Sequence, residues 1–142
     1  MRNNQAGMSI LEILIALTLL GLAGTFVAGK VFENLQEGKV QTAKIQIKSL
    51  GDRLKEFRRD CGFFPTEDQG GFEALINKPE GGRECKRYSP TGYIDGGKIP
   101  TDPWDAEYIY QSDGKTYTII SLGADNAEAG EGFDADINSK DL

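Results

Sequence analysis

The stretch Gly7-Met8-Ser9-Ile10-Leu11-Glu12, followed by the apolar run Ile13–Gly29, decides how this chain is organised. From Met8 the sequence stays apolar for about 22 residues, the length of a helix that crosses a bilayer. Glu12 is the ionisable residue that interrupts this run. Because a charge inside a membrane segment is costly, Glu12 is a candidate functional residue that needs a cationic partner.

Three interpretations of this N-terminus are open. A secretory signal peptide explains the basic start and the apolar core, but no A-x-A cleavage site follows the run. A plain N-terminal anchor leaves Glu12 unexplained. In the interpretation we favour, cleavage after Gly7 leaves the apolar helix in the mature protein. The new amine at Met8 then lies one helical turn from Glu12 and pairs with it, within one chain or between neighbouring chains.

Composition limits the classes of function. The chain has 142 residues, with 22 acidic against 16 basic side chains and a net charge of −6. Such a surface argues against nucleic acid, whose phosphates need basic clusters. There is no histidine, the commonest general base and a common zinc ligand. In an extracytoplasmic domain Cys61 and Cys85 favour one disulfide, whereas in a reducing compartment they would stay free thiols.

The residues after the anchor predict a small α+β domain. Apolar side chains recur at steps of four and three, which predicts a helix packed on the domain's own sheet; they are Ala43, Ile47, Leu50, Leu54 and Phe57. This helix should end near Asp60, and no proline separates it from the anchor, so one long helix is expected to serve both. Strands are expected at Glu107–Gln111 and Lys115–Ser121, joined by a turn at 112–114.

Two shorter segments also carry local signals. Gly71–Asn77 predicts a short helix with Phe72, Leu75 and Ile76 on its apolar face. Pro100–Asp105 predicts a turn, because two prolines restrict the backbone of their neighbours.

The C-terminal segment Gly123–Leu142 concentrates carboxylates, namely Asp125, Glu128, Glu131, Asp134, Asp136 and Asp141. Like charges repel, so either this loop is hydrated and disordered or a hard cation such as Ca2+ holds it. Ca2+ takes roughly six to eight oxygen ligands. The spacing Asp134-x-Asp136-x-Asn138 is not an EF-hand, because Ser139 stands where glycine is needed. The residues alone leave both interpretations open.

Several blocks resemble the type IV pilin-like family, and in particular the major pseudopilins of type II secretion. Gly7–Glu12 is similar to a prepilin peptidase site, usually Gly followed by Phe-Thr-Leu-Leu-Glu. Four further blocks follow in the family's order, namely Phe64–Gly70, Ile99–Trp104, Ser121–Asp125 and Asp134–Ile137. The chain departs from the family pattern at Gly71-Phe72, at both cysteines and at Asn138-Ser139-Lys140.

The resemblance implies a structural subunit without catalytic activity. It implies a leader over 1–7 removed by prepilin peptidase between Gly7 and Met8, a transmembrane and filament-core helix over 8–30, and a pilin-like periplasmic head over 31–142. It places the chain in the bacterial inner membrane as a single-pass protein, with Met8 open to N-methylation and Glu12 acting in assembly. The chain would polymerise with itself, beside minor pseudopilins and an inner-membrane assembly platform, to drive folded proteins across the outer membrane.

The resemblance also implies a calcium site in the C-terminal loop. Its ligands would be the carbonyl of Leu122 and the side chains of Asp125 and of either Asp134 or Asp136. Without the resemblance, this site remains one of two interpretations of an acidic loop.

Other classes of function stay open. A type IV pilin of a surface fibre for adhesion or motility fits the leader equally well, but the Asp-Pro-Trp and Ser-Leu-Gly-Ala-Asp blocks argue against it. A membrane-anchored calcium-binding domain is a second alternative. A membrane-anchored hydrolase is disfavoured because Ser89 and Ser121 have no histidine partner. Asp102 and Asp105 beside Trp104 fit a turn better than a catalytic carboxylate pair.

Overall fold

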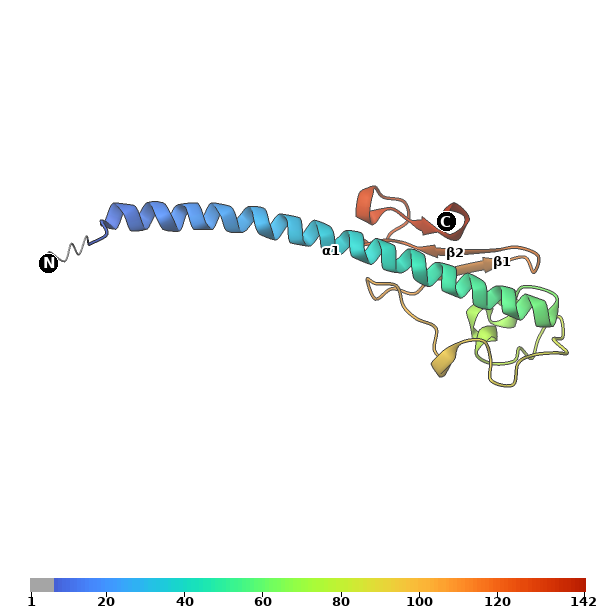
Figure 1. Cartoon of the computed structure of the whole chain (residues 1–142). Helices are drawn as coiled ribbons and strands as arrows, with labels where there is room; N and C mark the ends of the chain where they lie inside the picture. Colours follow the sequence, from blue (N-terminus) through green and yellow to red (C-terminus); the bar gives the residue numbers. More distant parts are fainter. Residues whose placement is uncertain (1–6) are drawn as a thin grey trace. The chain divides into compact units, whose positions relative to one another are not determined.

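A computed structural model describes residues 7–142. The chain divides into a unit that ends at Leu35 and a compact head over Gln36–Leu142. The helix α1 contributes to both, and the remaining elements belong to the head (Figure 1). The predicted leader falls largely on residues 1–6, which lie outside the described residues. The boundary predicted at residue 30, between the transmembrane helix and the head, stays a prediction.

The first unit consists mainly of the N-terminal part of α1, a helix that spans Ile10–Cys61. It is long and apolar enough to cross a membrane, with a mean hydropathy of 2.3 over its most apolar window and none of that window buried. Phe26, for example, is 82% exposed. Large exposed apolar surfaces mark contacts with a membrane or with other proteins. The Thr18 hydroxyl donates to the Leu14 carbonyl at 2.7 Å, which satisfies this polar group inside the apolar segment.

The second half of α1 supplies the core of the head. The predicted apolar stripe is confirmed, because its five side chains are at most 3% exposed. The helix ends at Cys61, one residue beyond the prediction, and Gly62 follows with a φ of +83°. Because this φ is in the left-handed region, glycine stops the helix there at little steric cost.

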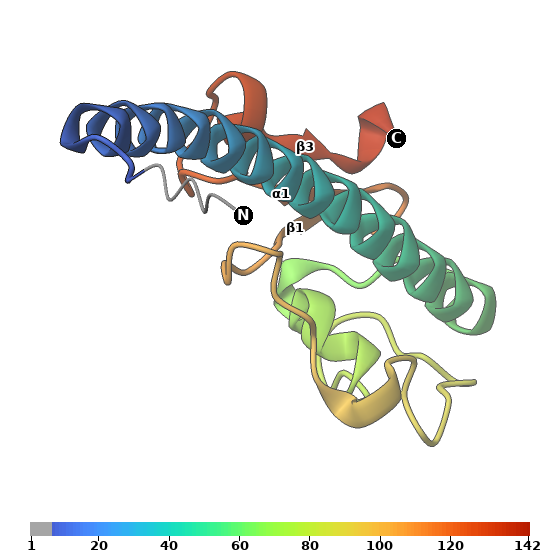
Figure 2. The same ribbon diagram turned by 60° about the vertical axis from the view of Figure 1, so that its left-hand side comes forward.

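A three-stranded antiparallel sheet packs beside this half of α1, in the order β1-β2-β3 (Figure 2). The strands are β1 (Ile109–Ser112), β2 (Tyr117–Ser121) and β3 (Ile137–Asn138). The hairpin is confirmed, but Ser112 pairs with Tyr117 and therefore lies in the strand, not in the predicted turn. The Asp113 carboxylate closes the turn by accepting from the backbone N–H groups of Lys115 and Thr116.

The predicted short helix at Gly71–Asn77 is a 3₁₀ helix over Gly71–Leu75. Its buried side chains differ from the prediction. Leu75 and Ala74 are buried, whereas Phe72 and Ile76 are only half-buried. The tighter winding of a 3₁₀ helix moves its buried face relative to an α-helix. Phe72 instead packs against the Tyr110 ring, with 4.6 Å between the ring centroids.

Candidate functional site

The N-terminal candidates lie at the start of α1. Gly7 and Met8 precede the helix and Glu12 lies in its first turn. The backbone N–H of Ile13 donates to the Ser9 carbonyl at 3.1 Å, so the helical geometry is established directly after Met8. A carboxylate in the first turn is favoured by the helix dipole. The side chain of Glu12 is exposed and forms no ion pair within residues 7–142. It is therefore available to a positive group from outside this unit or to a new α-amine at Met8.

The C-terminal loop runs between β2 and β3 and is closed by its own backbone. The N–H of Ala124 donates to the Phe133 carbonyl at 2.9 Å. Gly123 and Gly130 have φ values of +72° and +105°, and both press against the backbone of Asp134. A Cβ at Gly130 would come within 2.5 Å of the Asp134 carbonyl oxygen. The loop therefore requires glycine at these positions for the backbone to fold back on itself.

The predicted metal ligands lie in or beside this loop but do not form one acidic cluster. Leu122 is half-buried, and the three aspartates are exposed. Asp125 accepts from the backbone N–H of Ala127 at 3.1 Å, and Asp136 accepts from that of Ala129 at 3.2 Å. Within residues 7–142, no three metal-binding side chains converge. The donor set consists of oxygen atoms alone, which fits Ca2+, and the cation would be held by one or two carboxylates together with backbone carbonyls.

Asp102 organises the region where this loop begins, a role that the sequence analysis did not predict. Its buried carboxylate, 3% exposed, accepts from the N–H groups of Trp104 at 3.0 Å and Ala106 at 2.8 Å. It also accepts from the Ser121 hydroxyl at 2.7 Å, and Ser121 lies at the end of β2. The pair therefore fastens the proline-rich turn to the strand from which the C-terminal loop leaves. The sequence signal for this role was an aspartate within a proline-rich turn, since aspartate side chains in turns accept hydrogen bonds from nearby backbone N–H groups.

The same geometry places the two serines that a hydrolase would need. Ser121 is fully buried against Asp102, so no substrate reaches it. The Ser89 hydroxyl forms a hydrogen bond with the Thr91 hydroxyl at 3.3 Å. Asp105 is exposed with a φ of +66°, whereas Asp102 is buried. The interpretation of Pro100–Asp105 as a turn is confirmed.

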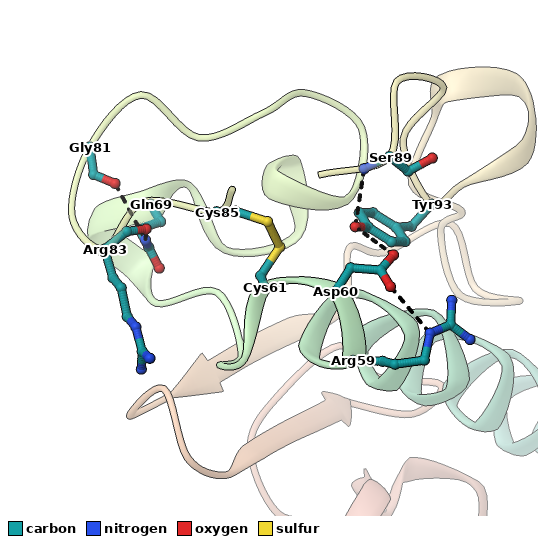
Figure 3. Close-up of a disulfide and its surroundings, with 9 residues drawn as sticks. All are labelled: Arg59, Asp60, Cys61, Gln69, Gly81, Arg83, Cys85, Ser89 and Tyr93. Atoms are coloured by element: carbon teal, nitrogen blue, oxygen red, sulfur yellow. Dashed lines mark hydrogen bonds and ion pairs between the residues drawn. A yellow bond between two sulfur atoms is a disulfide. The ribbon is translucent and has the colours of Figure 1, made fainter. Parts of the chain in front are cut away.

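A disulfide ties the end of α1 to the long loop that follows it. Cys61 and Cys85 are joined, with 4.6 Å between their Cα atoms (Figure 3). Gln69 is buried behind this bridge, and its side-chain amide donates to the carbonyls of Gly81 and Arg83. The pairing is the one that an oxidising compartment favours.

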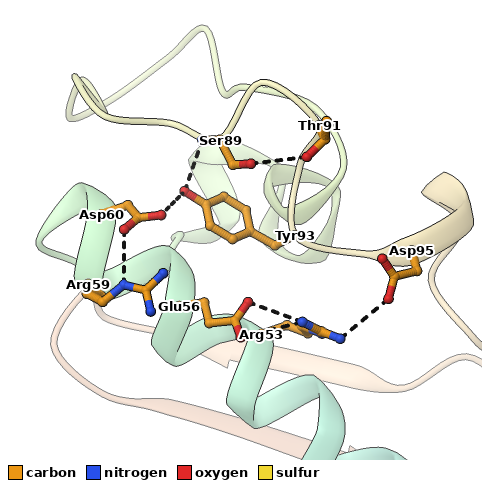
Figure 4. Close-up of polar contacts among 8 residues, drawn as sticks. All are labelled: Arg53, Glu56, Arg59, Asp60, Ser89, Thr91, Tyr93 and Asp95. Carbon is orange, nitrogen blue, oxygen red and sulfur yellow. Dashed lines mark hydrogen bonds and ion pairs between the residues drawn. The ribbon is translucent and has the colours of Figure 1, made fainter.

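Polar contacts add to this attachment (Figure 4). The Tyr93 hydroxyl donates to Asp60 at 3.1 Å and accepts from the N–H of Ser89 at 3.2 Å. Burial raises the pKa of Tyr93, so the hydroxyl keeps its proton and continues to donate at neutral pH. Arg53 on α1 pairs with Glu56 of the same helix and, at 3.5 Å, with the exposed Asp95 of the loop. The loop is therefore a fixed part of the head surface.

The apolar exposed helix, the glycine before it and the helix-on-sheet head together define a membrane-anchored pilin-like subunit. The chain belongs to the family described as type II secretion system (T2SS), protein G, whose family model matches residues 30–140. A model for the prokaryotic N-terminal methylation motif matches residues 2–28. This confirms the predicted family, the pilin-like fold class and the role as a structural subunit of the type II secretion pseudopilus.

Individual relatives agree with this assignment. The type II secretion system core protein G of Pseudomonas aeruginosa is 34% identical over 99% of this chain and 98% of its own length. The Vibrio cholerae protein of the same name is 36% identical over 95% of this chain and 91% of its own. A crystal structure of the major pseudopilin from the type 2 secretion system of enterohaemorrhagic Escherichia coli superposes with a TM-score of 0.64. It is 29% identical and covers 77% of this chain and 92% of that chain.

Proposed function

We propose that this chain is a non-catalytic filament subunit that is cleaved between Gly7 and Met8 by prepilin peptidase and held by α1 in the bacterial inner membrane, with its head in the periplasm. The observation that carries this proposal is the apolar surface of the first half of α1, none of which is buried in its most apolar window. Exposure of such a surface to water is unfavourable, whereas a bilayer, and later a bundle of like helices, would cover it.

Polymerisation follows from the same surface. When the subunit leaves the membrane, its apolar helix must be covered by helices of other copies. Contacts between different surfaces of successive copies do not close, so the assembly grows as a fibre. Minor pseudopilins would start this fibre, an inner-membrane platform would extend it, and the growing filament would push folded proteins through the outer-membrane channel.

Mass spectrometry of the N-terminus tests the processing step. We expect the protein from native membranes to begin at Met8, with or without an N-methyl group. A chain that still begins at Met1, or one cut beyond Gly29, would contradict the proposal.

Replacing Glu12 by alanine should lower incorporation into filaments by about tenfold or more, because the amine of a neighbouring subunit would be left in an apolar bundle without its carboxylate. The measurement is the fraction of subunits in sheared, sedimented filaments, at equal membrane levels of both proteins. Glu33→Ala is the matched control, since Glu33 lies on the same helix and is exposed next to Lys30. Equal incorporation of the Glu12 variant and the wild type would show that the carboxylate has no role in assembly.

We also propose that Ca2+ orders the C-terminal loop through the Leu122 carbonyl, Asp125 and one of Asp134 and Asp136. Support comes from the all-oxygen donor set and from the glycines that bring the Asp134 backbone into the loop. The bound ion would supply positive charge that offsets the repulsion among the carboxylates. A loop held in this way would present a single surface to neighbouring subunits.

Thermal denaturation tests the calcium site. Ca2+ at about 100 times its dissociation constant should raise the free energy of unfolding by about 2.7 kcal/mol, provided that the unfolded chain does not bind it. Asp125→Ala should abolish this gain. Glu128→Ala, in the same loop but outside the proposed ligand set, should preserve it. An unchanged gain in the Asp125 variant would exclude Asp125 as a ligand.

A further inference from the structure

A group of cations lies where α1 ends and the β1–β2 hairpin turns. The Arg58 guanidinium stacks on the Phe64 ring at 4.9 Å, and that of Arg83 stacks on the Phe63 ring at 5.1 Å, measured to the ring centroids. Lys115 lines, together with Arg83 and Phe63, a hollow of about 310 Å³. We call Arg58, Arg83 and Lys115 the cationic patch.

The hairpin and the disulfide loop bring Lys115 and Arg83 to one hollow, and Arg58 lies in the last turn of α1, just before the segment that carries both aromatic rings. The N–H of Phe64 donates to the carbonyl of Gly114 at 2.9 Å, which places the hairpin turn against the segment that follows α1. Figure 3 shows Arg83 extending from the disulfide loop toward this hairpin. Stacking on the aromatic rings restricts both exposed guanidinium groups, so a ligand that binds them costs less side-chain entropy.

The cationic patch lacks carboxylate partners within the described part of the head. None of its three side chains forms an ion pair there. Asp113 lies beside the hollow, but its carboxylate is committed to the turn. Hydrogen bonds from the N–H groups of Thr116 and Lys115 lower the pKa of Asp113. The patch can therefore bind a carboxylate from another molecule.

Unpartnered carboxylates lie at the other end of the head. Glu128 and Glu131 in the C-terminal loop are exposed and, within residues 7–142, take part in no side-chain hydrogen bond or ion pair, unlike Asp125 and Asp136. Within the head this loop lies beside the turns of α1 that follow Gln36, whereas the cationic patch lies at the last turn of α1 (Figures 1 and 2). Complementary charges therefore occupy opposite ends of one domain.

We propose that the cationic patch of one copy binds Glu128 and Glu131 of the next copy along the filament. This inference rests on the proposed assembly. All copies leave one membrane with their helices parallel, so the loop end of one head meets the patch end of the head below it. Such a head-to-tail contact repeats without closing. Arginine guanidinium groups bind carboxylates through two parallel hydrogen bonds, which would fix the position of each head on the next.

The overall charge gives this contact a second effect. The full sequence has a net charge of −6, and the proposed cleavage removes Arg2 and makes it −7, so copies of the chain repel one another. A local contact between opposite charges offsets that repulsion only in one relative orientation of the heads. The contact between the cationic patch and the two glutamates therefore fixes the register of neighbouring heads more than it increases the affinity between subunits.

Carbodiimide cross-linking of full-length filaments tests the contact directly, because the reagent joins a lysine amine to a carboxylate only when they touch. Filaments are assembled from an equal mixture of ¹⁵N-labelled and unlabelled chains, so that mass spectrometry separates links between copies from links within one. We expect mixed-label links from Lys115 to Glu128 or Glu131. Links from Lys115 to an α1 carboxylate such as Glu37, or none between copies, would overturn the proposal. Failure to form any filament would instead overturn the proposed assembly.

Charge reversal provides the second test. Arg83→Glu and Glu131→Arg should each lower the sedimented filament fraction by about fivefold or more, since attraction becomes repulsion at every repeat. The double variant should regain most of the loss. Lys98→Glu is the matched control, because Lys98 is exposed near Arg53 and Asp95, away from the patch. Single variants that assemble like the wild type, or a double variant no better than the singles, would overturn the proposal.

Discussion

Replacing Asp102 by alanine should lower the free energy of unfolding of the head by about 3–5 kcal/mol, because it removes the acceptor of one buried and two part-buried hydrogen bonds, and an unpaired donor costs up to about 1–3 kcal/mol. The variant leaves the N–H groups of Trp104 and Ala106 without their acceptor. It also leaves the Ser121 hydroxyl unpaired in a site that water does not reach. The lost free energy of unfolding therefore comes from two sources, the weakened turn at Pro100–Asp105 and its broken hydrogen bond to β2.

Two variants separate these contributions. Asp102→Asn keeps one oxygen as an acceptor, and its amide still contacts Ser121, so it should cost clearly less than alanine. Asp105→Asn is the matched control in the same turn, because Asp105 is exposed and asparagine tolerates its φ of +66°. We expect the control to stay within about 0.5 kcal/mol of the wild type.

Urea denaturation of the head, Gln36–Leu142, measures these differences, since this unit contains the whole hydrophobic core. The midpoint should fall strongly for Asp102→Ala with little change in slope. A loss below about 1 kcal/mol would mean that water or a rearranged turn satisfies the freed donors. The buried network around Asp102 would then contribute little to folding.

The elements with strong periodicity could be predicted from the sequence, and those fixed by distant contacts could not. The stripe from Ala43 to Phe57 determines α1, because five core positions repeat at helical spacing. The strand β3 has only two residues, Ile137 and Asn138, and hence no alternation to detect. It forms because the C-terminal loop turns back and pairs with the end of β2.

The candidate sites divide in the same way. Gly7 and Glu12 stand out in the sequence, since a charge and a cleavage motif interrupt or precede an apolar run, and their roles stay predictions. The acidic residues of the C-terminal loop were also visible, but their orientation was not. Asp136 turns toward the N–H of Ala129 because the left-handed backbone at Ala129 presents that donor. The cationic patch depends on a contact between Arg83 and Phe63, which the folded loop alone creates.

Removing the disulfide should lower the free energy of unfolding of the head by about 3–4 kcal/mol, the amount the chain-entropy model gives for a loop of this size. Cys61 and Cys85 are 24 residues apart in the sequence. The segment between them contains short 3₁₀ helices, and in the unfolded chain the bridge would close this segment into a loop. For a domain of this length the melting temperature should fall by roughly 12–25 °C in a Cys61→Ser, Cys85→Ser variant.

The control uses the reductant itself. Dithiothreitol should lower the melting temperature of the wild-type head and leave that of the double variant unchanged. If the reductant lowered both melting temperatures equally, its effect would have nothing to do with this bridge.

Amide hydrogen exchange of the double cysteine variant shows which part of the head loses stability first. The bridge joins the loop to the last turn of α1, whereas β1 and β2 are held by their own ladder and by the core. Exchange should therefore rise first over residues 62–90, with the hairpin still protected. Tyr93 and Arg83 would lose their places against Asp60 and Phe63 in the same step. Uniform exchange over the whole head would contradict this additional local opening and leave the entropy of the unfolded chain as the whole effect of the bridge.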